Sequence, residues 1–177
     1  AGPYYDDHPR KGKITVSQNL EARLEELESK VRELSDREAI RSLRFRYHEC
    51  INGEIFDAIP DLFSEDAVLD FDYLGQAKGR AELKAFFKKV ESLLSFVKQF
   101  MHNHAIEEQG ATSAKGYAYL EAKTISQGEA YFVAGRYDDE YVKEGGEWKF
   151  KKMALTPYFT VPFKEGWAQE DRLKMGR

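Results

Sequence analysis

The C-terminal half of the chain contains a β-hairpin pattern at residues 135–150. Residues 135–141 read GRYDDEY, residues 144–147 read EGGE and residues 148–150 read WKF. Two extended segments joined by a glycine-containing turn are typical of paired antiparallel strands. Because side chains alternate along a strand, Tyr137 and Tyr141 are expected on the same face. This half of the chain is therefore expected to form a sheet.

The hairpin belongs to a longer series of predicted strands, at residues 97–108, 113–125, 129–143 and 147–161. Glycine-bearing turns separate them. A short helix around residues 56–63, a strand at 66–71 and a helix at 81–94 come earlier. Helices followed by antiparallel strands indicate the α+β class. Strands this long must twist or bend, and a curved sheet over helices leaves a cavity open at one end.

The N-terminal region begins with an amphipathic pattern at residues 17–34. Its apolar positions alternate in spacings of four and three, and they are Leu20, Leu24, Leu27, Val31 and Leu34. This spacing predicts one helix, whose stripe is too short for an extended coiled coil and favours docking onto a neighbouring subunit or its own domain. Ser35 and Glu38 have capping-box spacing, which predicts that a second helix starts there.

The second predicted helix places a candidate functional residue on its buried face. That face carries Ile40, Leu43, Tyr47, Cys50 and Ile51, and the helix is expected to end at Asn52-Gly53. A buried phenol needs a hydrogen-bond partner, so Tyr47 is either a core residue bonded to the backbone or a group that binds a substrate oxygen. Asn52 is either a second polar site residue or only a helix cap. His48 lies one position away from the stripe and is expected to face solvent.

Composition limits the class of protein. The chain has 177 residues, of which 42% are hydrophobic and 14% aromatic, enough for one domain with one core. We expect a tail at residues 1–16, the domain at 17–163 and a tail or lid at 164–177. A net charge of −4 with interspersed signs argues against nucleic-acid binding.

The single cysteine and the hydropathy pattern indicate a location. Cys50 has no second cysteine to pair with, and no apolar run is long enough to span a membrane. The expected home is therefore the cytoplasm. No phosphate loop, dinucleotide fingerprint or serine-nucleophile elbow is present, so no cofactor is expected.

Two histidines are candidate acid–base groups. His102 and His104 stand two residues apart on a predicted strand, which places both on one face if the strand is regular. Imidazole titrates near neutral pH and suits proton transfer. The alternative is a sheet-edge histidine and a solvent-facing one. A third metal ligand is not evident nearby, so no metal site is predicted.

Aromatic residues are abundant in the predicted cavity region and favour a flat, hydrophobic ligand. The side chains expected to form its walls are Phe56, Tyr73, Tyr119, Tyr131, Tyr158 and Trp167. Since alternate strand positions face opposite ways, part of this set must lie in the core or on the other face.

The helix pair with Tyr47, together with residues 103–120 and 135–150, resembles the SnoaL-like family of the nuclear-transport-factor-2-like superfamily. The resemblance extends to bile-acid dehydratases, scytalone dehydratase and hexachlorocyclohexane dehydrochlorinase. It implies a cone-shaped α+β barrel with helices on a strongly curved sheet, a hydrophobic pocket and no cofactor. It also implies a homotrimer formed through the outer sheet face, with a homodimer as the alternative.

This chain departs from the catalytic pattern that the resemblance implies. In those lyases an aspartate after the second helix and a histidine on the following long strand transfer protons. Asn52 stands at the aspartate position here, and Gln99 stands at the histidine position unless the strand slips to His102 or His104. Asparagine cannot accept a proton at neutral pH, so the familial dyad is absent or rewired.

Three functional hypotheses follow. The first is a cofactor-independent lyase that removes water or formaldehyde from a hydroxylated aromatic or polycyclic substrate, with Tyr47, Asn52, His102 or His104 at the reacting groups and Gln99 in the binding site. The second is a ketone isomerase, which needs a carboxylate base such as Asp70 or Glu121 in the pocket. The third is a ligand-binding or assembly module without catalysis.

Overall fold

The computed structural model describes residues 16–168, so the predicted tail up to residue 15 and the last nine residues of the chain lie outside it. Its elements are α1 (Val16–Asn52), η1 (Phe56–Leu62), β1 (Phe63–Asp70), η2 (Asp72–Leu74), β2 (Gln76–Lys78), α2 (Gly79–Leu93), β3 (Phe96–Gln109), β4 (Ser113–Ser126), β5 (Glu129–Glu144) and β6 (Glu147–Pro162). The chain divides after Ser35 into two compact units. The unit that begins at Asp36 contains the sheet, α2 and the C-terminal part of α1.

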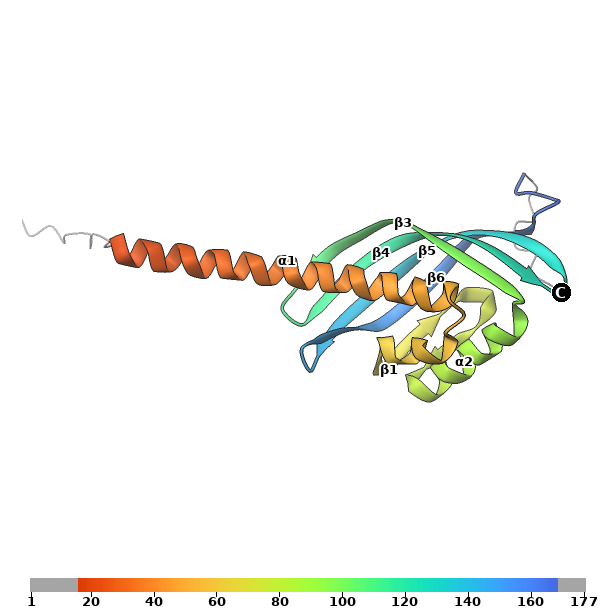
Figure 1. Ribbon diagram of the computed structural model, residues 1–177, viewed down its shortest axis with the longest axis horizontal. Helices are drawn as coiled ribbons and strands as arrows, with labels where there is room; N and C mark the ends of the chain where they lie inside the picture. The colour runs from red at the N-terminus through yellow and green to blue at the C-terminus, as the bar shows by residue number, and fades with distance from the viewer. Residues whose placement is uncertain (1–15, 169–177) are drawn as a thin grey trace, which may run out of the picture. The chain divides into compact units, whose positions relative to one another are not determined.

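The second unit is built on one curved sheet with the strand order β2-β1-β6-β5-β4-β3. Strands β3 to β6 form an antiparallel meander, β2 pairs antiparallel to β1, and β1 runs parallel to β6. Helix α2 and the C-terminal part of α1 lie against one face of this sheet (Figure 1). The predicted α+β architecture is confirmed. The sheet does not close into a barrel, because β2 and β3 form its two edges.

The hairpin predicted from residues 135–150 is the β5–β6 pair. Its last pair is Glu144 with Glu147, and Gly145 and Gly146 form the turn with φ values of 58° and 87°. Positive φ at both central residues is the geometry that glycine adopts without steric strain. Tyr137 and Tyr141 share one face, as their alternation predicts, and the structure shows that this face is buried.

The predicted helix break at Ser35 is wrong, because α1 runs continuously from Val16 to Asn52. Asp36, which follows Ser35, connects the helix to β5 and β6 through its carboxylate. Asp36 Oδ1 accepts hydrogen bonds from Lys143 Nζ at 2.7 Å and from Trp148 Nε1 at 2.9 Å. These two bonds lower the pKa of Asp36. Continuing the helix keeps its backbone hydrogen bonds, which a restart would interrupt.

The core lies between the inner face of the sheet and the helices. Leu83, Phe86 and Phe87 of α2 are buried there, and so are Ile40, Leu43 and Tyr47 of α1. Aromatic rings dominate the centre, where Phe63 packs on Phe150 at 5.1 Å between centroids and Phe86 meets Phe87 edge-on at 5.4 Å. Such pairs add about 0.5–1.5 kcal/mol each beyond the burial of their surface. This aromatic centre surrounds the cavity.

Candidate functional site

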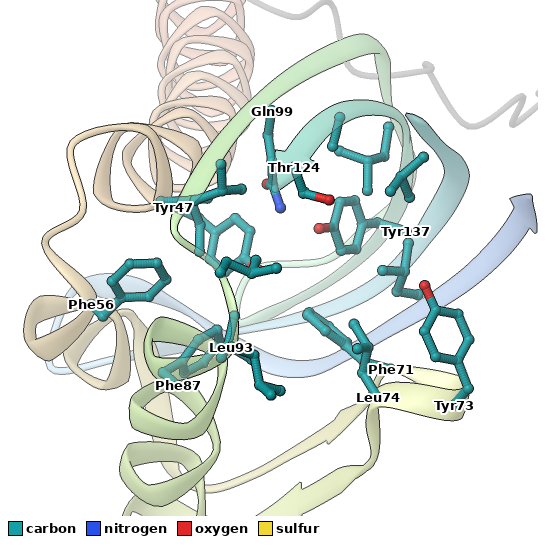
Figure 2. A pocket seen from close by; sticks show the side chains of 18 residues that line it. Tyr47, Phe56, Phe71, Tyr73, Leu74, Phe87, Leu93, Gln99, Thr124 and Tyr137 are labelled. Carbon is teal, nitrogen blue, oxygen red and sulfur yellow. The ribbon is translucent and has the colours of Figure 1, made fainter. Parts of the chain in front are cut away.

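A largely apolar cavity opens within the second unit, between the helices and the inner sheet face (Figure 2). It contains about 70 Å³ of free space. The lining comes from every layer of the fold and comprises Tyr47, Ile51, Phe56, Phe71, Tyr73, Leu74, Phe87, Val90, Leu93, Leu94, Val97, Gln99, Leu120, Ala122, Thr124, Val133, Tyr137 and Leu155. Tyr73 and Leu93 are partly exposed, so they mark the side that meets solvent.

Five polar side chains interrupt this apolar lining, and one of them, Tyr73, is bonded to Thr160 Oγ1. The polar ends of Gln99, Thr124 and Tyr137 gather in one part of the cavity (Figure 2). Tyr47 Oη, Tyr137 Oη, Gln99 Oε1 and Thr124 Oγ1 are buried and have no hydrogen-bond partner of normal geometry in the part of the chain that the structure describes. Unpartnered buried polar atoms destabilise a fold and call for an explanation. A ligand that bonds to them provides one.

Burial determines the protonation of the two phenols. It raises the pKa of Tyr137 to about 12 and raises the pKa of Tyr47 well above its usual value. The Arg44 guanidinium opposes both shifts because its positive charge favours a phenolate. Both tyrosines therefore carry their protons at neutral pH and are hydrogen-bond donors.

A buried cation lies directly behind the phenol rings. Arg44 is fully buried, with its Cζ atom 4.5 Å from the ring centroid of Tyr137 and 5.3 Å from that of Tyr47. Its Nη2 forms an ion pair with Asp139 Oδ2. Burial by itself would lower the pKa of Arg44, but the Asp139 carboxylate outweighs that effect and raises it. Arg44 therefore stays charged beneath the two donors.

The ion pair continues into a chain of bonded side chains. Tyr141 Oη donates to Asp139 Oδ2 at 2.8 Å, and His104 Nε2 lies 3.1 Å from Tyr141 Oη. With the Tyr141 proton used toward Asp139, His104 donates through Nε2. Burial lowers the pKa of His104 to about 4, so the imidazole is neutral at pH 7. His104 thus packs beside the cavity as part of this chain and does not line it.

The sequence contains a signal for this ion pair that the sequence analysis missed. Asp139 lies between Tyr137 and Tyr141 in the alternation of β5, and Arg44 lies four residues after Ile40 on the buried face of α1. Those spacings place both charges in the core. An isolated charge rarely occurs there, so the two had to pair.

The prediction that His102 and His104 share a face is wrong, because β3 has a bulge at Asn103 between them. The pairing of β3 with β4 shifts between His102 and Ala105, and Asn103 has a φ of 49°. This bulge directs His102 outward, where its Nε2 lies 3.8 Å from Glu121 Oε2. His102 is exposed and does not line the cavity.

His48 contradicts the expectation that it faces solvent, because it is 6% exposed. Its ring lies 5.3 Å from that of Tyr47 and 5.9 Å from that of Tyr137. Burial, with Arg44 in addition, lowers the pKa of His48 to about 3, and Gln99 interacts with the ring. Both ring nitrogens lack a bond of normal geometry within residues 16–168. Sequence reasoning missed His48 because the sheet buries more of the circumference of α1 than the apolar stripe alone indicates.

A family comparison identifies the fold's relatives. The SnoaL-like domain family matches residues 32–154. The chain belongs to the SnoaL-like family. An uncharacterized protein of Mycobacterium tuberculosis is 24% identical over 132 residues, which cover 73% of this chain and 90% of that protein.

Solved structures show the same SnoaL-like fold. A scytalone dehydratase candidate from Novosphingobium aromaticivorans has a TM-score of 0.70 and 22% identity, over 84% of this chain and 98% of that one. The hexachlorocyclohexane dehydrochlorinase LinA-type3 from Novosphingobium barchaimii has a TM-score of 0.69 and 18% identity, over 76% and 94% of the two chains. At these identities the similarity establishes the fold.

Within this SnoaL-like domain, Asn52 and Gln99 are direct neighbours. Asn52 Nδ2 donates to Gln99 O at 2.9 Å, and Gln99 N donates to Asn52 Oδ1 at 2.6 Å. This pairing needs a donor and an acceptor on the same side chain, which asparagine has and an ionised aspartate lacks. Asn52 therefore connects the end of α1 to β3, and the Gln99 side chain projects into the cavity.

The aromatic residues predicted as walls separate into two groups. Phe56 and Tyr73 line the cavity, and Tyr73 Oη is bonded to Thr160 Oγ1. The structure places the other four elsewhere. Tyr119 packs against Tyr158, Tyr131 Oη donates to Glu129, and Trp167 stacks on Phe132 and Phe159 at 5.5 and 5.4 Å. Strand alternation explains Tyr119 and the Phe132 partner of Trp167, which occupy outward positions of β4 and β5. Tyr131 occupies an inward position of β5 and is buried, but it lies outside the cavity lining.

The ionisable groups of the SnoaL-like unit do not assemble into a metal centre. Among residues 16–168, no cluster brings together three or more histidine, cysteine, aspartate or glutamate side chains that could hold an ion. Over the same residues, no helix combines the length and the apolar character needed to cross a membrane.

Proposed function

We propose that this protein is a cofactor-independent lyase that eliminates water or formaldehyde from a small hydroxylated aromatic molecule bound in the cavity. The observation that carries this proposal is a group of four buried polar atoms without a partner of normal geometry in a largely apolar pocket, with a buried cation beside two of the rings that carry them. The SnoaL-like fold and its dehydratase and dehydrochlorinase relatives support a lyase.

The size of the cavity narrows the substrate. A water molecule needs roughly 10–15 Å³ of such space, so the cavity holds about five water-sized groups. That capacity favours a single ring over a fused polycyclic system. In an aromatic dimer, one ring would enter and the other would remain near Tyr73 and Leu93 at the mouth.

The polar group is suited to an oxygen that gains negative charge. Tyr47 and Tyr137 are protonated donors, and the nearby Arg44 charge lowers the energy of an anion at their hydroxyls. Fixed donors in a site that excludes water stabilise a developing oxyanion strongly. We assign Tyr137 and Gln99 to the substrate oxygen and Tyr47 to the leaving hydroxyl.

The lining has no carboxylate or imidazole among the described residues, so the substrate itself must supply the electrons. A para-hydroxybenzyl alcohol can do this. Its phenol loses a proton, the ring pushes out the benzylic hydroxyl, and the C–O bond breaks. The proton leaves with that hydroxyl as water, and the product is a quinone methide. Tyr47 donates its proton to the leaving oxygen. The phenol's proton passes to the Tyr137 hydroxyl, which returns a proton to the neighbouring Tyr47 hydroxyl, so both tyrosines end protonated.

The isomerase alternative loses support from the position of its bases. Glu121 is partly exposed and pairs with Lys123 at 2.8 Å on the outer face, and Asp70 accepts a hydrogen bond from the backbone of Asp72. Neither side chain lines the cavity. The same lack of a base favours a binding module as the second candidate function.

The test is incubation of the purified protein, without added cofactor, with para-hydroxybenzyl alcohols and hydroxylated aromatic dimers, followed by product mass. Loss of water or formaldehyde is the expected result. Tyr137→Phe and Tyr47→Phe should each lower kcat/KM by at least tenfold, as is typical when one donor to a transition-state oxyanion is removed.

Tyr131→Phe is the matched control, since it removes a buried tyrosine hydroxyl that lies outside the cavity lining. It should leave turnover unchanged. Saturable binding of these compounds with no product would contradict the lyase and support the binding module.

We also propose a homotrimer formed through the outer sheet face, with a homodimer as the alternative, and a cytoplasmic location. The outer face exposes Phe100, Tyr158 and Trp167, and Lys123 Nζ lies 4.7 Å from the ring centroid of Phe100. Exposed aromatic patches of this kind mark association surfaces. Light-scattering mass at micromolar concentration tests the assembly, and a monomer would refute it.

A further inference from the structure

The first unit presents an apolar stripe with no cover in the part of the chain that the structure describes. Five large apolar side chains of α1 are 57–64% exposed, and they are Leu20, Leu24, Leu27, Val31 and Leu34. Single exposed apolar residues are common on protein surfaces, but a continuous row along one helix face marks an interaction site.

The spacing of the stripe defines a heptad register. Leu20, Leu27 and Leu34 are seven residues apart and occupy d positions, and Leu24 and Val31 occupy a positions. Leucine at d with a β-branched residue at a favours two parallel strands, and Val31 is the a residue that meets this rule. The next a and d positions are Glu38 and Arg41, so the seam ends at Leu34.

Charges beside the stripe distinguish between the two orientations of a partner. In this register Arg23 and Lys30 are g residues, and Glu21 and Glu28 are e residues. A parallel pair places each g residue near the e residue five positions later in the partner, which brings Arg23 to the partner's Glu28. An antiparallel pair would place the basic g residues together and the acidic e residues together, which repel.

These side chains are available for such contacts. Glu28 lies 3.8 Å from Arg32 of the same helix, and both are largely exposed. Exposed pairs contribute about 0.3–0.5 kcal/mol on a helix, so Glu28 can exchange this partner at little cost. The Lys30–Glu26 pair at 2.5 Å supports the helix itself.

We propose that residues 16–34 form a parallel, in-register, two-stranded coiled coil with the same segment of a second copy of this chain. The segment spans fewer than three heptads, and short isolated helices are marginal in water. The association is therefore expected to depend on protein concentration. It uses a surface distinct from the cavity and from the outer sheet face.

The first experiment compares the mass of the full chain by sedimentation velocity with that of Leu27→Glu. The charge at a d position should halve the mass, whatever assembly the sheet face supports. Ser29→Glu introduces the same charge at an f position, on the opposite side of the helix from the seam, and should leave the mass unchanged. An unchanged mass in Leu27→Glu, or a threefold fall, would overturn the two-stranded pairing.

A second experiment tests the orientation. In a Cys50→Ser background, Ser17→Cys places a thiol at an a position, and mild oxidation should join two chains through a disulfide. In an antiparallel pair these thiols lie at opposite ends, since a helix rises 1.5 Å per residue, and no disulfide would form. A lack of cross-linked product at a concentration where the mass is doubled would overturn the parallel arrangement.

Charge reversal provides the third arm. Arg23→Glu and Glu28→Arg should each weaken the dimer, because each places like charges across the seam. The two changes in one chain restore opposite charges in the parallel pair and should recover the wild-type mass at the same concentration. A double variant weaker than both single variants would overturn the proposal.

Discussion

Two neighbouring polar groups in the core of the second unit differ in how their atoms are bonded. In the first, Arg44, Asp139, Tyr141 and His104 form a chain in which each side chain bonds to the next, although one further polar atom each of Arg44, Asp139 and His104 has no partner of normal geometry within residues 16–168. In the second, Tyr47, Tyr137, Gln99 and Thr124 point polar atoms into the cavity without partners of normal geometry within residues 16–168.

This difference distinguishes polar groups that stabilise the fold from polar groups that are available to bind a ligand. The bonds along the chain compensate part of the desolvation of its charges and give the core a defined arrangement. An unpartnered hydroxyl contributes nothing comparable to stability, but it can bond to a ligand. The two groups meet where Arg44 contacts the rings of Tyr47 and Tyr137, so the structural charge sets the electrostatics of the cavity.

The largest predicted effect breaks the bonded chain. Asp139→Ala leaves the fully buried Arg44 cation without its partner and should lower the free energy of unfolding by about 3–5 kcal/mol. Urea titration followed by circular dichroism measures this. Asp138→Ala, at an exposed neighbour, is the control and should change stability by less than about 0.5 kcal/mol. A loss below about 1 kcal/mol in Asp139→Ala would contradict the role given to this ion pair.

The next prediction compares a tyrosine hydroxyl in each of the two groups. Tyr141→Phe removes a hydroxyl that donates to Asp139 and should cost about 1–3 kcal/mol of stability. Tyr137→Phe removes a hydroxyl that has no bond of normal geometry and only weaker interactions with Tyr47 and Gln99, so it should cost less than about 1 kcal/mol of stability while ligand binding falls. Parallel urea and ligand titrations of the two variants measure both properties. Equal destabilisation by both changes would show that the distinction between the groups is wrong.

A pH effect follows from His48, which lies next to the cavity group. Its pKa is about 3 in the folded protein, below the usual 6.5, because burial disfavours the imidazolium. Between pH 6.5 and about pH 3, His48 therefore binds a proton in the unfolded chain but not in the folded protein. Stability should fall as pH drops below about 6.5, with a slope approaching about 1.4 kcal/mol per pH unit for this histidine, until the pH nears 3.

His48→Gln tests that contribution by flattening the slope between pH 6 and pH 4. Urea titrations at several pH values provide the comparison. His102→Gln changes an exposed imidazole on the outer face and serves as the control. An identical slope in His48→Gln and in the wild type would assign the acid sensitivity to other groups.

The smallest effect concerns the link between α1 and β3. Asn52→Asp keeps the acceptor for Gln99 N but removes the donor to Gln99 O, and it should cost about 1 kcal/mol of stability. Thermal unfolding detects the change. Asn52→Asp should also weaken ligand binding, because this link holds Gln99 in place. Unaltered binding would show that the Asn52 link does not position Gln99 for the ligand.

Local patterns predicted those parts of the molecule that depend on neighbours in the sequence. Alternation along β5 placed Tyr137 and Tyr141 on one face, and the helical spacing around Tyr47 placed it on a buried face, where the structure brings it to the cavity. The turn at Gly145 and Gly146 was readable because only certain residues adopt positive φ without strain. The capping-box spacing at Ser35 misled, because a continuing helix competes with a cap over the same residues.

Other features arise from contacts between distant segments. The bulge at Asn103 separated His102 from His104, although their spacing in a regular strand predicts one face. Burial of His48 depends on how far the sheet covers α1. The ion pair joins residues 95 positions apart, so only the packed fold brings Arg44 to Asp139.

The sequence by itself determined the α+β class, the shared face of Tyr137 and Tyr141 and the entry of Tyr47 into the core, because backbone periodicity and turn chemistry are local properties. The tertiary structure decided that Gln99, Thr124 and Tyr137 join Tyr47 at one cavity and that both candidate histidines of β3 stay outside its lining. It did so because register, bulges and the curvature of the sheet set which side chains converge, and these depend on pairing between strands far apart in the chain.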